Sequence, residues 1–242
     1  MLITGVNNEH IKELIKLKDK KYRDKTNKFM VEGEHLVLEA YKSGLVLELI
    51  LQENTTFPLD IKTTYVTSEI IKKISTLETP PQVMAVVKKK EDGAIGEKVL
   101  ILDNIQDPGN LGTMVRSALA FDIDTIILSE TSVDLYNPKV IRATQGMLFH
   151  LNIIRTSLEP LISKLKDAGY KIIGTKVTSG HDVKEAKIYS HFALVLGNEG
   201  SGISDNILDL CDEYLYIKMN DKVESLNVAV AASILMYELY NK

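Results

Sequence analysis

Arginine is scarce in this sequence, and one arginine stands in a setting that could do chemistry. Only four of the 29 basic residues are arginine, and its planar fork of donors suits phosphates and oxyanions in a way that lysine cannot copy. Arg116 follows Asn110 by six residues, after an Asp-Pro-Gly turn that ends an apolar run. We expect Asn110 to cap the helix that carries Arg116. The alternative to a functional arginine is a purely structural interpretation, in which the segment is a capped helix and Arg116 is simply exposed to solvent.

A glycine-rich segment follows another apolar run and holds one carboxylate. Gly197, Gly200 and Gly202 surround Glu199, and glycines let a ligand approach the backbone closely. The carboxylate disfavours a phosphate ligand and favours one that carries hydrogen-bond donors or positive charge. By itself this is a weak signal.

Two more polar segments occupy similar positions, residues 174–180 and 217–227. The second ends in Ser225 and Asn227, immediately before an apolar helix. Both side chains could cap that helix. Capping is the simpler explanation for Ser225, whereas the amide of Asn227 must find partners as it enters a buried element. Because the helix is apolar nearly all round, we expect it to lie in the core and to meet a second subunit.

The elements that must position these segments are parallel strands. Apolar runs alternate mostly with helical patterns, which indicates a parallel sheet covered on both faces. Ligands bind such sheets at the carboxyl ends of the strands, so the candidate loops follow residues 105, 174, 196 and 217. The predicted strands are 99–105, 125–128, 151–154, 171–174, 192–196 and 214–217.

The first half is predicted to be a compact α/β domain, followed by a charged linker at 88–98. Its predicted helices are 8–19, 35–42 and 68–75, the last capped by Ser68, and its predicted strands are 29–32, 46–51, 63–66 and 83–87. Residues 12–28 hold eight basic and three acidic side chains. Such local positive charge suits a nucleic-acid backbone, although a solvated helix end is the commoner explanation.

Composition excludes several classes of protein. One cysteine among 242 residues rules out a disulfide framework and a cysteine-based zinc site, and the five histidines show no metal-ligand spacing. No metal is therefore expected. The N-terminal sequence is not a secretory signal and no segment is long enough to span a bilayer, so we expect a reduced, cytosolic protein. A nucleotide-dependent enzyme is disfavoured because the dinucleotide glycine fingerprint and the Walker lysine are missing.

Together the segments resemble the SpoU/TrmH family of RNA ribose 2′-O-methyltransferases, within the SPOUT class. The resemblance lies in Asn110-Leu111-Gly112 with Arg116, in residues 196–202, and in Ile217 with residues 225–231; residues 21–34 are similar to the family's N-terminal substrate-binding domain. It implies an RNA substrate-binding domain at 1–90, a linker at 91–98 and a SPOUT methyltransferase domain at 99–242. That domain would hold a mostly parallel sheet, a C-terminal trefoil knot and a homodimer interface at the knot and the last helix.

The resemblance also implies roles for particular residues. The methyl donor would be S-adenosylmethionine, held by Thr175, Leu196, Gly197, Gly200, Ile217, Met219 and Leu226. The catalytic set would be Arg116, Asn110, Glu199, Ser225 and Asn227, with Asn110 positioning Arg116 and Glu199 either orienting Arg116 or offsetting the sulfonium charge. RNA would meet Lys20, Lys21, Arg23, Lys25 and Arg142. The resemblance gives Arg116 a part in removing the hydroxyl proton. Because arginine stays protonated in proteins, an equally physical role is to hold a phosphate and stabilise the alkoxide.

Two alternatives remain within this resemblance. Ribosomal RNA is favoured over transfer RNA by family analogy alone. A non-catalytic RNA-binding or ribosome-assembly factor of the same fold is disfavoured because Asn110, Arg116, Glu199 and Asn227 are all present.

Overall fold

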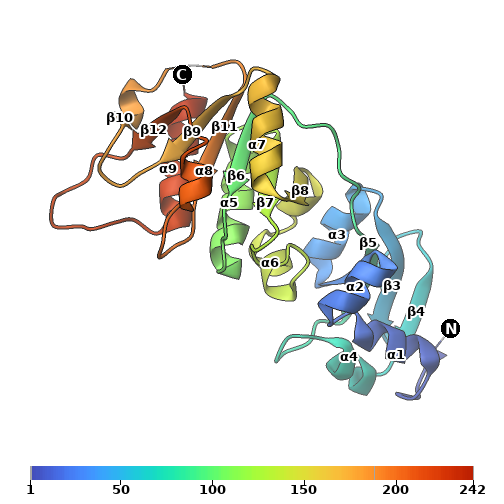
Figure 1. The fold of residues 1–242 in the computed structure, drawn as a ribbon. Helices are drawn as coiled ribbons and strands as arrows, with labels where there is room; N and C mark the ends of the chain where they lie inside the picture. Colours follow the sequence, from blue (N-terminus) through green and yellow to red (C-terminus); the bar gives the residue numbers. More distant parts are fainter. Residues whose placement is uncertain (1, 188, 242) are drawn as a thin grey trace. The chain divides into compact units, whose positions relative to one another are not determined.

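The chain forms two compact units in a computed structural model that describes residues 2–187 and 189–241 (Figure 1). The first unit comprises residues 1–91 and 134–149, and the second comprises residues 92–133 and 150–242. No helix in the described residues is long and apolar enough to cross a membrane. The expected division at a 91–98 linker differs from these units in one segment, residues 134–149.

The first unit is built on a mixed five-stranded sheet. Its order is β1 (Leu2–Ile3), β4 (Thr63–Val66), β3 (Val46–Gln52), β5 (Val83–Lys88) and β2 (Lys28–Glu32), with β5 antiparallel to both of its neighbours. The helices are α1 (Glu9–Lys16), α2 (Lys20–Thr26), α3 (Glu34–Lys42) and α4 (Ser68–Ile74). Apolar residues of α1 and α4, among them Ile11, Leu14 and Ile70, pack with Ile50 and Met84 of the sheet into one core cluster.

Two helix boundaries in this unit correct the sequence analysis. The helix predicted over 8–19 ends at Lys16, and a separate helix α2 begins where the Asp19 side chain accepts a hydrogen bond from the Lys21 backbone N–H at 2.7 Å. Thr67, not Ser68, caps α4. Asp19 is a capping residue inside the range predicted as one helix, and Thr67 competes with its neighbour Ser68 as the cap of α4.

Residues 134–149 pack with the N-terminal unit although they are far from it in sequence. The segment contains α6 (Pro138–Ala143) and the 3₁₀ helix η1 (Met147–Phe149). The ring of Phe29 in β2 lies 4.6 Å from Tyr136 and 6.3 Å from Phe149, centroid to centroid. Gly146 has a φ of +84° and fits so closely on α3 that a Cβ there would lie 2.7 Å from Glu39. This segment therefore belongs to the core of the first unit.

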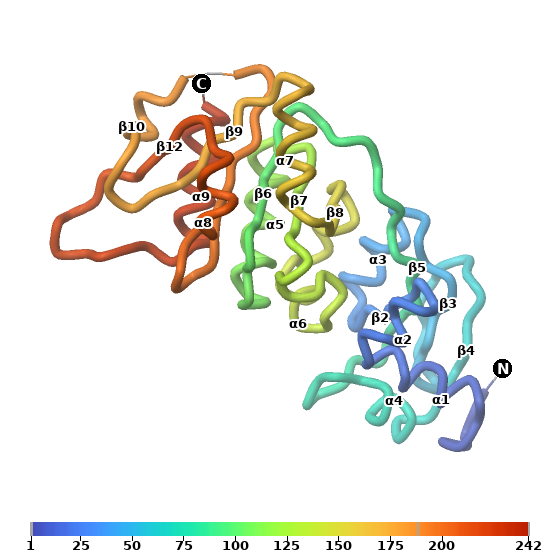
Figure 2. The backbone as a smooth tube through the Cα atoms, viewed as in Figure 1, coloured from blue at the N-terminus to red at the C-terminus, as the bar shows by residue number. Residues whose placement is uncertain are grey.

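The second unit is built on a seven-stranded sheet in which every pair is parallel. Its order is β10 (His181–Asp182), β12 (Glu213–Tyr216), β9 (Lys171–Thr175), β11 (Phe192–Leu196), β6 (Lys98–Leu102), β7 (Thr125–Ser129) and β8 (Asn152–Thr156). The sheet was expected to be mostly parallel and is parallel throughout, with β10 as an additional edge strand. Figure 2 follows the backbone through this unit.

Helices cover this sheet on both faces. They are α5 (Pro108–Ala120), α7 (Leu158–Asp167), α8 (Asp205–Leu208) and α9 (Val228–Tyr240), with the short 3₁₀ helix η2 (Val183–Glu185). The apolar side chains of α7 and α8 share a core cluster with β6, β9 and β11. The crossovers β6–α5–β7 and β8–α7–β9 run in opposite directions, so right-handed connections place α5 on the opposite face from α7. There α5 pairs with α9, where Ser117 and Ser233 share a hydrogen bond of 2.7 Å.

The strand order reverses beside β6, and this places the candidate loops. From β6 the chain runs outward to β7 and β8, then crosses back to β9, β11 and β12 on the other side. Ligand sites of open parallel sheets lie at such a reversal, at the carboxyl ends of the strands. The Asp103 N–H, just after β6, donates to the Leu196 carbonyl at 2.9 Å, so the loops after β6 and β11 begin side by side.

Candidate active site

The loops after β9, β11 and β12 and the start of α9 enclose a pocket of about 210 Å³. All seven residues expected to hold a cofactor line it: Thr175, Leu196, Gly197, Gly200, Ile217, Met219 and Leu226. Glu199 and Ser225 of the expected catalytic set line it too. Segments that are far apart in the sequence therefore meet at one site.

The glycine-rich turn after β11 is shaped by its own backbone and by Asn198. The Asn198 N–H donates to the Gly202 carbonyl at 2.8 Å, and the Gly202 N–H donates back to the Asn198 carbonyl at 3.0 Å. The Asn198 side-chain oxygen accepts from the Gly200 N–H at 2.9 Å. A Cβ on Gly197 would lie 2.1 Å from the backbone of Gly202. Only glycine fits at residue 197, because the turn folds back directly onto it.

Side chains that the sequence analysis did not single out tie this turn to the loop after β6. Asp103 is buried, and its carboxylate accepts from the Ser204 N–H at 2.9 Å and the Ser204 hydroxyl at 2.6 Å. The Asn198 amide donates to the Asn104 carbonyl at 2.9 Å. The signal for Asp103 was a carboxylate at the end of an apolar run, but sequence alone does not show which loop it would meet.

A chain of three polar side chains joins Glu199 to α5 and α9. The Asn110 amide donates to the Glu199 carboxylate at 3.0 Å, and the Asn227 amide donates to the Asn110 side-chain oxygen at 3.0 Å. Asn227 also caps α9, because its side-chain oxygen accepts from the Ala229 N–H at 3.0 Å. The expectation that Ser225 caps this helix is therefore wrong.

The expected capping role of Asn110 is also wrong, and the correction explains its contacts. Asp107 caps α5 by accepting from the Asn110 backbone N–H at 2.8 Å, and Pro108 occupies the first turn. Proline is favoured there because its fixed φ suits the helix and its missing N–H costs nothing. Asn110 lies inside the helix, so its side chain is available to contact Glu199.

Hydrogen bonds hold Glu199 in its charged form. Its carboxylate also accepts from the backbone N–H groups of Gln106 at 3.5 Å and Asp107 at 3.3 Å. Burial raises the pKa of this carboxyl, but the hydrogen bonds, foremost the one from Asn110, outweigh that effect and leave the pKa below its ordinary value. Glu199 is negatively charged at neutral pH.

Arg116 lies on the exposed surface of α5 and makes no hydrogen bond or ion pair with the residues that the structure describes. It does not line the pocket, and it makes no hydrogen bond with Asn110 or Glu199. The side chains of the other three arginines donate hydrogen bonds within the protein. Arg155 donates to the carbonyls of Glu130 and Ser132, both at 2.8 Å.

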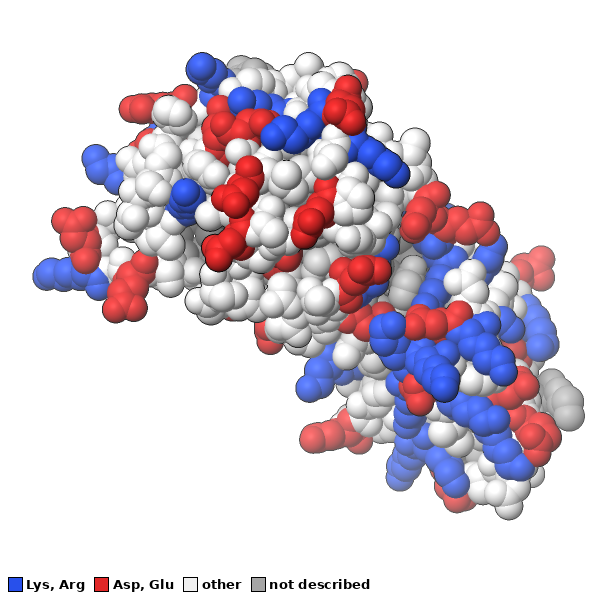
Figure 3. Space-filling model, viewed as in Figure 1, with Lys and Arg blue, Asp and Glu red and all other residues white. Residues whose placement is uncertain are grey.

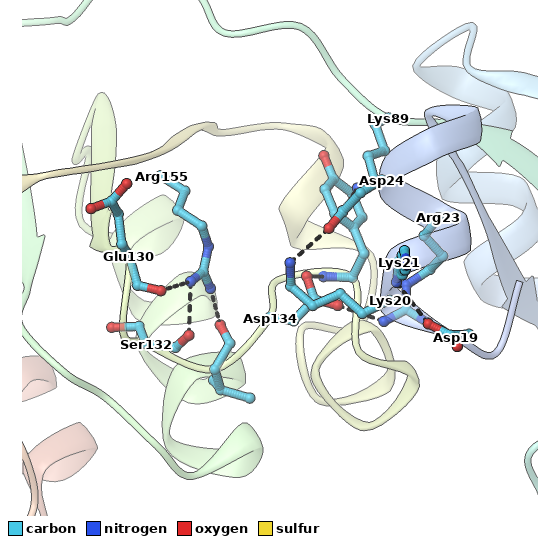
Figure 4. A network of polar contacts seen from close by, with 12 residues as sticks. Asp19, Lys20, Lys21, Arg23, Asp24, Lys89, Glu130, Ser132, Asp134 and Arg155 are labelled. Carbon is cyan, nitrogen blue, oxygen red and sulfur yellow. Dashed lines mark hydrogen bonds and ion pairs between the residues drawn. The ribbon is translucent and has the colours of Figure 1, made fainter.

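The expected RNA-contacting residues fall into two groups. Lys20, Lys21 and Lys25 of α2 are exposed. Arg23 is a correction: it is 4% exposed and pairs with Asp134 at 2.6 Å, as Figure 4 shows. A guanidinium held in the protein interior does not reach a phosphate, so Arg23 has a structural role.

Arg142 is half-buried, and its guanidinium donates to the Thr76 hydroxyl at 3.0 Å within the first unit. Among the described residues, no cluster of three or more His, Cys, Asp or Glu side chains could hold a metal ion.

Comparisons with known proteins agree with this geometry. Residues 97–237 match the model of the SpoU rRNA Methylase family, and residues 8–85 match the MRM3-like substrate binding domain. The chain is 42% identical to the 23S rRNA (guanosine(2553)-2′-O)-methyltransferase RlmP of Bacillus subtilis, over 98% of each chain.

Two solved structures with bound S-adenosylmethionine are also similar. An rRNA methyltransferase from Sinorhizobium meliloti has 26% identity and a TM-score of 0.87, over 100% of this chain and 97% of that one. The SpoU methyltransferase AviRb from Streptomyces viridochromogenes has 25% identity and a TM-score of 0.85, over 97% of this chain and 98% of that one. The family match spans more than half of the chain and the Bacillus relative nearly all of it, and so the protein belongs to the SpoU rRNA methylase family.

Proposed function

We propose that this protein transfers a methyl group from S-adenosylmethionine to a ribose 2′-hydroxyl of 23S rRNA. The observation that carries the proposal is the pocket, in which three loops from distant parts of the sequence meet beside the Glu199–Asn110–Asn227 chain. The Bacillus relative, whose name specifies 23S rRNA, supports this substrate class. We further propose that the protein acts in the cytoplasm.

The pocket fits the methyl donor. Leu196, Ile217 and Leu226 supply apolar walls suited to an adenine ring, and Gly197 lets the turn after β11 fold back tightly beside them. When bound, S-adenosylmethionine supplies an electrophilic methyl group on a positively charged sulfur. Glu199, ionised at neutral pH, provides the opposite charge at the edge of the pocket.

Arg116 is the catalytic arginine of this proposal. Its guanidinium remains protonated, so it acts by holding the phosphate next to the target ribose and stabilising the developing alkoxide. Its exposure and its lack of a partner among the described residues leave its donors available to RNA.

We propose in addition that the protein is a homodimer whose interface includes α9. Val230, Tyr237 and Tyr240 on this helix are 46%, 52% and 48% exposed. Large apolar side chains so exposed on one helix indicate a surface that a partner covers. The family resemblance implies that this partner is a second copy of the chain. It also implies that the C-terminal segment forms a knot and that the knot belongs to the same interface.

The deciding experiment measures transfer of labelled methyl to unmodified 23S rRNA and to transfer RNA. The wild-type chain should label 23S rRNA, and Arg116→Ala should lower transfer at least a hundredfold, the order expected for loss of an oxyanion-stabilising donor. Arg116→Ala should leave S-adenosylmethionine binding unchanged in calorimetry. Arg116→Lys, which keeps the charge but loses the planar fork, is the matched control and should recover only part of the activity.

Other outcomes would redirect the proposal. Equal loss of methyl transfer and cofactor binding in Arg116→Ala would remove Arg116 from the chemistry. Labelling of transfer RNA alone would replace the substrate. Cofactor binding without transfer to either RNA would favour the non-catalytic binding factor.

A further inference from the structure

Arg155 lies at the end of β8, where its side chain holds the loop that follows β7. The two strands are parallel and Arg155 stands opposite Leu128, so its side chain begins beside the start of the loop at 129–133. Its guanidinium donates to four backbone carbonyls of this loop (Figure 4), those of Ser129 at 3.3 Å, Glu130 at 2.8 Å, Ser132 at 2.8 Å and Val133. One cation therefore fixes the path of the whole loop.

Arginine is the residue type that this arrangement requires. A guanidinium presents several N–H donors in a rigid planar fork, whereas the ammonium of lysine is a compact point charge. In the view of Figure 3 the basic side chains crowd over the first unit and are scattered over the second, to which Arg155 belongs. Arg155 is half-buried and directs its donors at the protein's own backbone, so its role is to shape this loop.

The loop at 129–133 in turn holds the loop after β6. The buried hydroxyl of Ser129 accepts from the Asn104 N–H at 2.9 Å, and the buried hydroxyl of Ser132 accepts from the Ile105 N–H at 3.1 Å. Asn104 has a φ of +57°, a left-handed conformation that persists when its surroundings support it. The path of the loop after β6 therefore depends on its neighbour.

The loop after β6 supplies donors that bind Glu199. The backbone N–H groups of Gln106 and Asp107 donate to the Glu199 carboxylate. The Asn104 carbonyl accepts from the Asn198 amide at 2.9 Å, and that amide also donates to the Glu199 carboxylate at 3.3 Å. A shift of this loop would move all of these donors away from the carboxylate together.

We propose that Arg155 is a positioning residue for methyl transfer: by holding residues 129–133, it keeps the loop after β6 where the N–H groups of that loop bind Glu199. This proposal rests on the proposed function, because it takes Glu199 to serve the transfer. Arg155 acts through the two loops and is not itself a catalytic residue.

The test compares Arg155→Lys with a matched control on the same strand, Asn152→Ala. Arg155→Lys keeps the positive charge, so a change at Glu199 reports the path of the loops and not the loss of a cation. Asn152 begins β8 and likewise donates to backbone carbonyls, those of Gly93 at 3.3 Å and Ala94 at 3.0 Å. Both variants lose hydrogen bonds to the backbone, so both should unfold at a lower urea concentration than the wild type.

The first measurement is the pKa of Glu199, by NMR titration of its carboxyl carbon in the free protein. In Arg155→Lys this pKa should rise, because fewer hydrogen bonds then oppose the effect of burial. The carboxylate of the variant should therefore lose its charge at a higher pH than that of the wild type. Asn152→Ala should titrate as the wild type does.

The second measurement is methyl transfer to transcribed 23S rRNA at saturating concentrations of both substrates. The kcat of Arg155→Lys should fall about tenfold or more, since a displaced group in the active site is costly even when the mutation is remote. The KM for the RNA should stay as in the wild type, because the lost contact is not one that binds RNA. Asn152→Ala should keep the wild-type kcat.

An unchanged pKa of Glu199 in Arg155→Lys would overturn the proposal, and so would an equal rise in Asn152→Ala. If Arg155→Lys fails to fold, Ser132→Ala, which removes the acceptor of the Ile105 N–H, should raise the same pKa, and an unchanged value there would also overturn the proposal. A raised pKa in Arg155→Lys together with an inactive wild type would support the positioning role and refute the proposed reaction.

Discussion

Asn110 is used at both ends of its side chain, which makes it the connecting residue of the active site. Its nitrogen donates to Glu199 and its oxygen accepts from Asn227, each at 3.0 Å. An aspartate would lose the donor and place a second carboxylate against Glu199. The amide therefore lowers the pKa of Glu199 and holds Asn227 in position.

The prediction at the residue scale concerns the titration of Glu199. Asn110→Ala removes the hydrogen bond that most strongly lowers its pKa, so the pKa should rise toward the ordinary value. A lowered pKa keeps the carboxylate charged until pH falls through that value, so the loss of charge should begin at higher pH in the variant. NMR titration of the Glu199 carboxyl carbon, assigned with Glu199→Gln, measures the shift. Asn206→Ala, which alters an amide bonded to Glu159 instead, should leave it unchanged.

The four arginines show what sequence can reveal at this scale. Scarcity favoured a role that needs arginine rather than lysine, and the family motif singled out Arg116. Nothing in the sequence separated Arg23 from its basic neighbours, because its burial depends on Asp134, which is 111 residues away. Only the fold distinguishes an arginine that fills an interior site from one that faces solvent.

At the scale of elements, the turn after β11 is the most tightly specified part of the pocket. Gly197→Ala would place a Cβ 2.1 Å from the backbone of Gly202, and the turn cannot open without breaking its two backbone hydrogen bonds. We expect a loss of about 1–3 kcal/mol in the free energy of unfolding and at least tenfold weaker S-adenosylmethionine binding. Urea denaturation and calorimetry measure the two effects.

The matched control for this prediction is Gly200→Ala. The nearest atom to a Cβ at residue 200 is the Asn198 side-chain oxygen at 3.6 Å, an ordinary contact distance. This variant should unfold at the wild-type urea concentration. If the two alanine variants were equally stable, close packing at Gly197 would not be what constrains the turn.

Element boundaries were predictable where periodicity decided them and not where caps competed. The predicted strand 192–196 has the same bounds as β11, because a buried strand is a continuous apolar run between polar residues. Asp107 and Asn110 are both good capping residues, and Pro108 in the first turn was the signal that favours Asp107. The predicted strand 99–105 ended early, at Leu102, because Asn104 adopts a φ of +57°.

At the scale of the molecule, the first unit is completed by a segment that the sequence places elsewhere. Val140, Ile141, Leu148 and Phe149 of this segment are buried. A local apolar pattern shows that residues will be buried but not against which core, so sequence analysis could not assign residues 134–149 to the N-terminal unit.

The prediction at this scale concerns the ion pair that holds the segment. Asp134→Ala leaves the Arg23 guanidinium buried without its carboxylate, which should cost about 3–5 kcal/mol in the free energy of unfolding. Arg23→Met/Asp134→Ala removes both charges and should recover part of that loss. Urea denaturation of the two variants measures the difference, and a loss below about 1 kcal/mol for Asp134→Ala would show that the pair does not secure the segment.

The placement of residues 134–149 has a consequence for how this protein could be recombined with its relatives. The chain passes from one unit to the other three times, near residues 91, 133 and 149, whereas the match to the methylase family runs without interruption over 97–237. A chimaera joined at the linker would carry the segment away from the core that buries it and would expose Phe149 and Ile141 to solvent. A successful graft of the substrate-binding half onto another methylase must therefore exchange two stretches of the gene at once.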